Sequence, residues 1–517
     1  MCGLMCCGVT TTVIGAILVF GTAFLGYSII PDVVENQIIE EVILLNDTEA
    51  IERFEDVPFA LNFTVRLFNV TNPDSVAMGA VPILREVGPY IYRLRQRRLI
   101  EEFGEDHLVY RRLDVFEFNA EASYPNTEDD VLTIVNVPFH AVLNAVEEIS
   151  PALMPTVNLG LNGIFGPNTG PLANIRVRDL LFDGIPLCEN AVLVSAVACN
   201  VIRSMSSDLQ NMELQADNSL RFSLLAYRNG SLGERYNVSR GSEDIEDLGR
   251  ISMYSGQTYL SYWPNLKDGE LSNCNLINGT DSGIYNPFLD LNRPLYALNP
   301  DICRSVELRY QHDVEYEGLP GVKFAANEWM FGNDDGCFCL NVTQGLKRED
   351  GCMYRGAIEL FSCVGAHLVL SYPHFLFADP EYVNGVIGVT PNPEIHRIFL
   401  DLEPNTGIVL RGAKRAQFNI FMRPLPGIPT TSNLRTTLTP IFWIEESILL
   451  PEEYVDRLST TLISTLNLLQ ILIPVLVAVS CVVFVVGVVL IATSRLKRRP
   501  NQHSALSSAQ PSKSSDK

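Results

Sequence analysis

Hydrophobic residues concentrate at the two ends of the chain. Residues 1–31 and 458–494 contain no Lys, Arg, Asp, Glu or His, whereas charged side chains are frequent between these stretches. About 20 apolar residues are needed to cross the hydrocarbon core of a bilayer. Both stretches are long enough, and we predict membrane-spanning helices at residues 9–30 and 464–494.

The alternative for the first stretch is a cleaved signal peptide. Such a peptide has a basic leader and an apolar core of only about 7 to 15 residues. This chain has no basic leader, its apolar run is longer, and apolar positions continue at Val33, Ile38 and Val42. These features favour a retained membrane helix.

The basic residues that follow the second stretch indicate its orientation. Arg495, Lys497, Arg498 and Arg499 lie directly after it, and basic residues flank membrane helices mainly on the cytosolic side. We therefore expect a cytosolic N-terminus (1–8), a cytosolic tail (495–517) and an ectodomain at residues 31–463.

Between the spans, periodicity predicts both strands and helices. Apolar and polar residues alternate as in half-buried strands at residues 59–70, 110–118, 397–402 and 417–422. The segments 140–150 and 175–200 have helical patterns, and the Gly- and Pro-rich apolar segment 154–171 is predicted to be a loop. With no repeat or long linker, the pattern indicates a single α+β ectodomain with a helical region at about 140–200.

The charge of the chain is distributed unevenly. The 517 residues carry a formal charge of −22, and the tail 495–517 has six basic residues against one acidic residue. The rest of the chain therefore carries −27, almost all of it in the ectodomain.

Seven N-x-Ser/Thr sequons lie between the two predicted spans. These N-glycosylation acceptors are Asn46, Asn62, Asn69, Asn229, Asn237, Asn278 and Asn341. Their confinement to this segment agrees with its predicted extracytosolic location.

The cysteines form separate groups. Cys2, Cys6 and Cys7 precede the first span, where S-acylation is the functional interpretation and unmodified thiols the alternative. A second group comprises Cys274, Cys303, Cys337, Cys339, Cys352 and Cys363. A zinc site could be built from its last four members, but the neighbouring sequons place the group in an oxidising compartment, which favours three disulfides. Their connectivity does not follow from spacing, and Cys188 and Cys199 are either a fourth pair or buried thiols.

Catalytic motifs are absent from the sequence. It has no G-x-S-x-G, H-E-x-x-H, P-loop or G-x-G-x-x-G pattern in a suitable context. We expect a non-enzymatic protein with no cofactor and no bound metal.

Nine short segments, in order along the chain, resemble the class B scavenger receptor family, which includes platelet glycoprotein IV, the lysosomal integral membrane protein and the insect sensory neuron membrane proteins. They are LFNVTNP (67–73), REVGPYIY (85–92), SYW (261–263) with INGTD (277–281), DICRS (301–305), CFC (337–339), PHFLFADP (373–380), HRIFLDLEPNTG (396–407), AKRAQFNI (413–420) and FWIEE (442–446). The resemblance implies a large antiparallel β core capped by an apical helical bundle, with an internal apolar tunnel towards the bilayer. It also implies the disulfides Cys274–Cys337, Cys303–Cys363 and Cys339–Cys352.

The helical region departs from the family pattern in its charge. Some members are thought to receive anionic ligands on apical lysines, but residues 140–200 contain no Lys and carry a net charge of −3. A negative surface disfavours anionic particles, so we expect neutral or zwitterionic lipids, or a cationic or apolar protein surface. The predicted docking edge comprises Leu153, Met154, Leu159, Leu161, Ile164 and Phe165; the alternative is that these residues pack inside the bundle.

These observations predict a receptor that binds lipids or lipoprotein-like particles and passes lipid through its ectodomain to the plasma membrane. The alternatives are a lysosomal or endosomal receptor that sorts a protein cargo, and an adhesion or phagocytic receptor. The tail 495–517 has no paired leucines, which favours the cell surface over the lysosome. We expect no nucleic-acid partner, and the sequence is compatible with a homo-oligomer.

Overall fold

The computed structural model describes residues 3–192, 194–206, 209–266, 269–333 and 336–498. The chain divides into two compact units. The terminal-helix unit comprises Met1–Glu40 and Glu452–Lys517, and the ectodomain unit comprises Glu41–Pro451.

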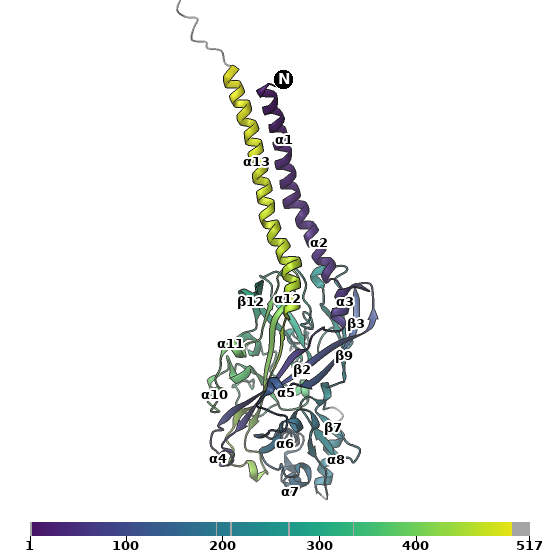
Figure 1. Ribbon diagram of the computed structural model, residues 1–517. Coiled ribbons are helices and arrows are strands. Elements are labelled where there is room, and N and C mark those ends of the chain that lie inside the picture. Colours follow the sequence, from purple (N-terminus) through teal and green to yellow (C-terminus); the bar gives the residue numbers. More distant parts are fainter. Residues whose placement is uncertain (1–2, 193, 207–208, 267–268, 334–335, 499–517) are drawn as a thin grey trace, which may run out of the picture. The chain divides into compact units, whose positions relative to one another are not determined.

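Two long helices make up the terminal-helix unit (Figure 1). The first consists of α1 (Leu4–Phe24), a π-helical turn (Leu25–Ile29) and α2 (Ile30–Val42). The second consists of α12 (Glu452–Leu458), a π-helical turn (Ser459–Ile463) and α13 (Ser464–Arg498), which continues past Pro474. Both are long and apolar enough to cross a membrane, and the predicted spans 9–30 and 464–494 lie within them.

Small residues allow α1 and α13 to pack closely. A Cβ atom added to Gly15 would lie 2.5 Å from the Cα of Phe484, and one added to Gly487 would lie 2.4 Å from the backbone N of Thr12. The hydroxyl of Thr22 also donates a hydrogen bond to the hydroxyl of Ser480 (3.4 Å). Close backbone approach and interhelical hydrogen bonds are what hold helices together in a bilayer, where the hydrophobic effect between helices is absent.

One large antiparallel sheet dominates the ectodomain unit, which confirms the predicted α+β class. Its strands follow the order β10 (Ile251–Tyr254), β9 (Leu232–Ser239), β3 (His107–Phe118), β2 (Leu84–Phe103), β1 (Leu61–Val70), β18 (Thr437–Leu449), β17 (Val409–Met422), β16 (Phe399–Leu402), β13 (Leu319–Ala325), β12 (Arg304–Tyr316) and β11 (Leu295–Asn299). The short strand β15 (Val369–Ser371) pairs with β17 and with β14 (Ala357–Glu359). The sheet therefore joins segments from both ends of the ectodomain.

The central strands have the predicted alternation. In β1, Phe63, Val65 and Leu67 are buried and Asn62 is exposed. Thr64 is buried as well, so the alternation is incomplete. β1 pairs with β18 so that Asn62 lies opposite Ser447.

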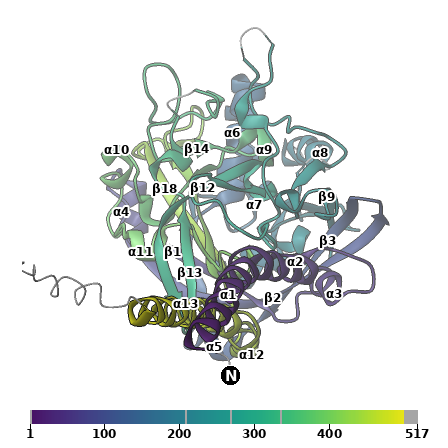
Figure 2. The same ribbon diagram turned by 90° about the horizontal axis from the view of Figure 1, so that it is seen from above.

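Short helices flank the two sides of the sheet. α4 (Pro73–Ala77), α10 (Pro380–Val383) and α11 (Pro393–His396) lie on one side, and α3 (Glu49–Glu55) lies near β3 on the other (Figures 1 and 2). Two further short helices are α5 (Ala120–Ser123) and α9 (Phe361–Val364). The main hydrophobic core lies between the sheet and the helical region, and a smaller core surrounds Leu44, Phe54 and Tyr110.

The helical region gathers beyond one end of the long strands (Figure 1). Its helices are α6 (Val137–Ile149), α7 (Met154–Phe165) and α8 (Val194–Ser206). Two small sheets accompany them, β4 (Val131–Val135) with β5 (Leu172–Arg176), and β6 (Ile185–Leu187) with β8 (Leu220–Phe222) and β7 (Met212–Leu214).

Two predictions for the helical region were wrong. The segment 154–171 was predicted to be a loop, but its first part is α7, because Met154, Val157, Leu161 and Ile164 bury one helical face. The segment 175–200 was predicted to be helical throughout, but it contains the end of β5, a π-helical turn (Asp179–Asp183) and β6 before α8 begins. In both cases tertiary packing outweighed local propensity.

Disulfides link four pairs of cysteines in the described part of the chain. They are Cys188–Cys199, Cys274–Cys337, Cys303–Cys363 and Cys339–Cys352. The last three are the pairs that the resemblance implies, and the first joins the two cysteines whose state the sequence left open. It connects the segment after β6 to α8.

The helix packing predicts an intramolecular cross-link. In a Cys481→Ala background, the full chain carrying Thr22→Cys and Ser480→Cys should form a bond between α1 and α13 under mild oxidation, measured by mass spectrometry of linked peptides. Adding Gly15→Leu should lower the yield several-fold, because the larger side chain would meet the backbone of Phe484. The exposed position of Phe20→Cys, paired with Ser480→Cys, is the control and should cross-link poorly. A bond that forms only between two copies of the chain would contradict this packing.

Candidate ligand-binding cavity

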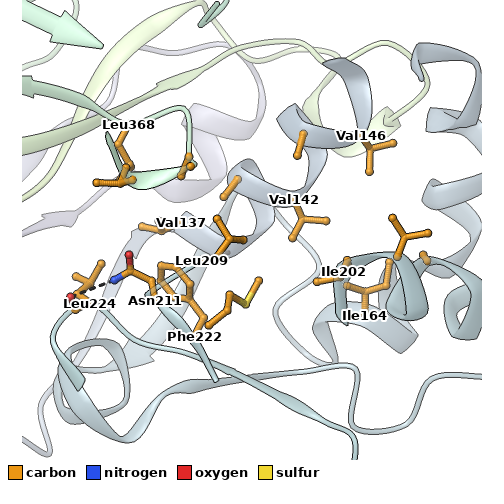
Figure 3. A pocket seen from close by; sticks show the side chains of 18 of the residues that line it. Val137, Val142, Val146, Ile164, Ile202, Leu209, Asn211, Phe222, Leu224 and Leu368 are labelled. Atoms are coloured by element: carbon orange, nitrogen blue, oxygen red, sulfur yellow. Dashed lines mark hydrogen bonds between the residues drawn. The ribbon is translucent and has the colours of Figure 1, made fainter. Parts of the chain in front are cut away.

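The ectodomain unit contains a cavity of about 340 Å³. Residues of α6, α7 and α8, among them Val142, Ile164 and Ile202, form one part of its wall (Figure 3). Residues of the large sheet form another part. Most of the lining side chains are aliphatic or aromatic, with polar groups at Thr156, Asn211, Tyr227, Arg228 and Asp301. Small-molecule sites in proteins are typically apolar concavities of this kind with a few placed polar groups.

Helix α6 is fixed by the residue that precedes it. The side-chain oxygen of Asn136 accepts a hydrogen bond from the backbone N–H of Phe139 (3.4 Å), which caps the first turn. Its side-chain amide donates to the carbonyls of Asn168 (2.7 Å) and Gly170 (2.9 Å). One stripe of the helix faces the cavity: Val137, Ala141, Val142, Ala145, Val146 and Ile149.

Helix α8 supplies a second apolar stripe. The lining positions Val194, Val197, Ala198, Val201 and Ile202 follow the spacing of a single helical face. The helix is held by the Cys188–Cys199 disulfide and by close contact with α7. A Cβ atom on Gly163 of α7 would lie only 2.2 Å from the hydroxyl oxygen of Ser195, so glycine permits this approach.

The cavity opens between α6 and α8. Four of its lining residues, Ile149, Leu153, Val197 and Val201, are exposed to solvent as well, and Val197 is 67% exposed. Exposed aliphatic side chains that gather around one opening indicate contact with an apolar ligand or surface.

The inner end of the cavity lies against the sheet. Phe442 and Ile444 alternate along β18 and face the cavity, and Phe418 of β17 stacks on Phe442 with ring centres 4.9 Å apart. Glu446 continues the same face of β18, opposite Lys414. The wall therefore changes from apolar to charged within a few residues of one strand.

An ionic cluster occupies this charged end, with Asp114 and Arg228 buried and the other members partly exposed. Its members are Arg112, Asp114, Arg228, Asp301, Lys414 and Glu446. Arg228 contacts three carboxylates, those of Asp114 (2.7 Å), Asp301 (3.0 Å) and Glu446 (3.8 Å). Arg112 contacts Asp114 (3.3 Å), and Lys414 contacts Glu446 (2.8 Å).

The cluster keeps its members charged. Burial alone would raise the pKa of Glu446, but Lys414, Arg228 and Arg112 lower that pKa to about 2. The pKa of Asp114 is also lowered, because Arg112 and Arg228 outweigh the effect of its burial. Asp114 and Glu446 are therefore ionised at neutral pH, and the cluster combines three basic with three acidic side chains.

Four of the six predicted docking residues lie in the interior. Met154, Leu161, Ile164 and Phe165 are buried, because they form the core-facing stripe of α7. Only Leu153 and Leu159 are exposed, and of these only Leu153 lines the cavity. The four buried residues therefore agree with the alternative interpretation, in which they pack inside the bundle.

The surface charge of the helical region is partly paired. Arg176 contacts Asp129, Asp179 and Asp183, and Arg178 contacts Glu128 and Asp183. Glu147 is paired with Arg423, and Glu189 with Arg221. The partners that lie outside residues 140–200 are two acidic residues, Glu128 and Asp129, and two basic residues, Arg221 and Arg423. Including them leaves the net charge of the region at −3.

The predicted modification sites differ in their exposure. Asn46, Asn62, Asn229 and Asn341 are exposed, and Asn69, Asn237 and Asn278 are half-buried. Cys6 and Cys7 are exposed in α1, whereas Cys2 lies outside the described residues. Glycosylation and acylation at these residues remain predictions.

The residues that line the cavity were not identified by the sequence analysis, although the resemblance implied an internal apolar tunnel. The apolar stripes of α6 and α8 are visible as helical periodicity, but the same pattern is produced by a helix that packs against a solid core. The members of the ionic cluster come from distant parts of the chain, and no local motif connects them.

Comparison with known proteins shows similarity over most of the chain. The model of the CD36 family matches residues 13–491. The sensory neuron membrane protein 2 of Drosophila melanogaster is 33% identical, over 87% of this chain and 90% of the relative. That of Anopheles gambiae is 31% identical over 90% of each chain, and the sensory neuron membrane protein 1 of Bombyx mori is 32% identical over 87% of this chain and 84% of the relative.

Two histidines of the ectodomain unit, His140 and His396, are buried, and their burial favours the neutral form of the ring. The ring nitrogen Nε2 of His140 in α6 lies 3.1 Å from the carbonyl of Pro171, and burial lowers the pKa of His140 to about 4. His396 stacks on His374 with ring centres 4.4 Å apart and accepts a hydrogen bond from the backbone N–H of Asn392. Burial, and then the neighbouring His374, lower the pKa of His396 to about 4.

These pKa values predict a loss of stability in acid. The unfolded chain binds protons at histidine near pH 6.5, and the folded chain only near pH 4, so stability falls as the pH drops from 6.5 to 4. At pH 5 the penalty is roughly 2 kcal/mol for each histidine. The full chain in detergent should therefore unfold several degrees lower at pH 5.0 than at pH 7.5, and the variant His140→Gln with His396→Asn should lose part of this difference. The exposed His312→Gln is the control, and an unchanged acid shift in the double variant would contradict the assignment.

Proposed function

Because the chain belongs to the CD36 family, as its match over residues 13–491 shows, we propose that it is a membrane receptor that captures lipids or lipid-bearing particles. In this proposal the ectodomain takes up lipid and passes it to the membrane. The supporting observation is the apolar cavity with its exposed aliphatic mouth.

The physical advantage of such a cavity is the exclusion of water. Each CH₂ group that leaves an apolar environment for water costs about 0.8 kcal/mol, so a lipid that leaves its carrier alone meets a large barrier. An apolar wall at the point of transfer removes most of this barrier.

The size of the cavity supports one kind of occupant. Small-molecule sites span about 300–1,000 Å³, and a cavity of about 340 Å³ lies near the lower limit. We infer that it accommodates a single-chain lipid. The net charge of −3 in the surrounding region supports neutral or zwitterionic ligands over anionic particles.

We place the receptor in the plasma membrane with both termini in the cytosol. The basic residues that follow residue 494 support this orientation, and all seven sequons fall in the ectodomain unit. The similar proteins named as membrane proteins of sensory neurons, together with the tail that lacks paired leucines, support the cell surface.

Filling the cavity should block lipid uptake. Ala145 of α6 and Ala198 of α8 both line the cavity, so Ala145→Trp and Ala198→Trp would place an indole ring in the space of the ligand. In cells that express the full chain, we expect at least a fivefold lower initial rate of uptake of a fluorescent single-chain lipid, with unchanged surface expression.

The matched control is Ala122→Trp, at an exposed position of α5. A second readout is the lipid content of the purified full chain, measured by mass spectrometry. Loss of bound lipid without loss of uptake would separate binding from transfer, and normal uptake with both variants would refute the proposed role of the cavity.

A further inference from the structure

The inner end of the cavity combines balanced charge with unused hydrogen-bonding capacity. Arg228 directs its guanidinium at Asp114 and Asp301, and the ionic cluster as a whole contains equal numbers of positive and negative groups. A ligand that reaches this end meets no unpaired cation.

Two groups that line the cavity there keep atoms available. Asp301 uses Oδ2 to accept from Arg228, whereas its Oδ1 has no partner among the described residues, and its side chain is 29% exposed. The hydroxyl of Tyr227, which interacts electrostatically with Asp301, likewise forms no hydrogen bond with the described residues. The cavity end thus offers one acceptor and one donor.

We propose that the inner end of the cavity recognises the hydroxyl group of an uncharged single-chain amphiphile and discriminates against the carboxylate of the same chain length. The inference rests on the proposed function, because it assumes that the cavity holds a lipid. It adds the chemical class of the polar group and its orientation, with the hydroxyl inward and the alkyl chain towards the mouth.

A hydroxyl group matches the two available atoms. It donates to Oδ1 of Asp301 and accepts from the hydroxyl of Tyr227, so both protein groups gain a partner inside the cavity. A hydrocarbon without a polar group would displace water from both atoms and replace neither hydrogen bond, which is costly.

A carboxylate fits the same place badly. It has no proton to donate to Asp301, and it brings a negative charge beside that carboxylate. The positive charge of Arg228 is already shared by two close carboxylates and one more distant one, so the added charge would be buried without a counterion.

The inference can be tested with two ligands of equal length. The full chain in nanodiscs is captured on scintillation beads, and 1-dodecanol and dodecanoate compete with radiolabelled 1-dodecanol at pH 7.4, with empty nanodiscs subtracted. We expect 1-dodecanol to compete at a concentration at least tenfold lower than dodecanoate.

Two variants separate the roles of the groups. Tyr227→Phe removes the donor and should weaken 1-dodecanol binding about three- to tenfold, the usual effect of one hydrogen bond. Asp301→Asn removes one negative charge beside Arg228, so dodecanoate should bind more tightly and the preference for the alcohol should shrink several-fold. Asp129→Asn is the matched control, because Asp129 also pairs with an arginine, but its side chain is 81% exposed and does not line the cavity.

The outcomes distinguish the inference from the proposed function. If neither ligand binds the unmodified chain, the proposed function fails and the inference fails with it. If both bind equally well, or if Asp301→Asn leaves the ratio unchanged, the cavity is a lipid site but its inner end does not select a hydroxyl group.

Discussion

The ectodomain depends on the pairing of β1 with β18. These strands lie almost 400 residues apart in the chain, yet Asn62 and Ser447 are opposite each other in the ladder. Pairing of such distant segments carries a loop-closure cost that grows only slowly with length, and the backbone hydrogen bonds and buried Phe63, Val65 and Leu67 offset it. As a result, the chain enters and leaves the ectodomain at neighbouring points.

The same strand that completes the sheet also forms the cavity. Along one face of β18, Phe442 and Ile444 are apolar and Glu446 is charged. A pleated strand places alternate residues on one face, so three side chains are enough to build an apolar wall and its charged end. Burial of the ionic cluster is tolerated because each charge has a close partner of opposite sign.

The sequence predicted the features that depend on local pattern. The two apolar helices and strands such as β1 follow from composition and alternation, and the resemblance supplied the antiparallel core. Local pattern failed for α7, because its glycines were interpreted as breakers although Gly163 allows close packing against Ser195. The resemblance implied an apolar tunnel, but the lining residues could not be predicted, since an empty space is defined by what several segments together leave unfilled.

The mouth between α6 and α8, together with the charged floor at Arg228, has a kinetic consequence. If the cavity holds one lipid chain, as we propose, an occupied receptor must release that chain before it can bind another. The rate of uptake would then saturate as the ligand concentration rises, and chemically different lipids would compete for the same cavity. At saturation, the number of lipids that one receptor transfers per unit time would be set by how long each lipid stays in the cavity, rather than by the ligand concentration.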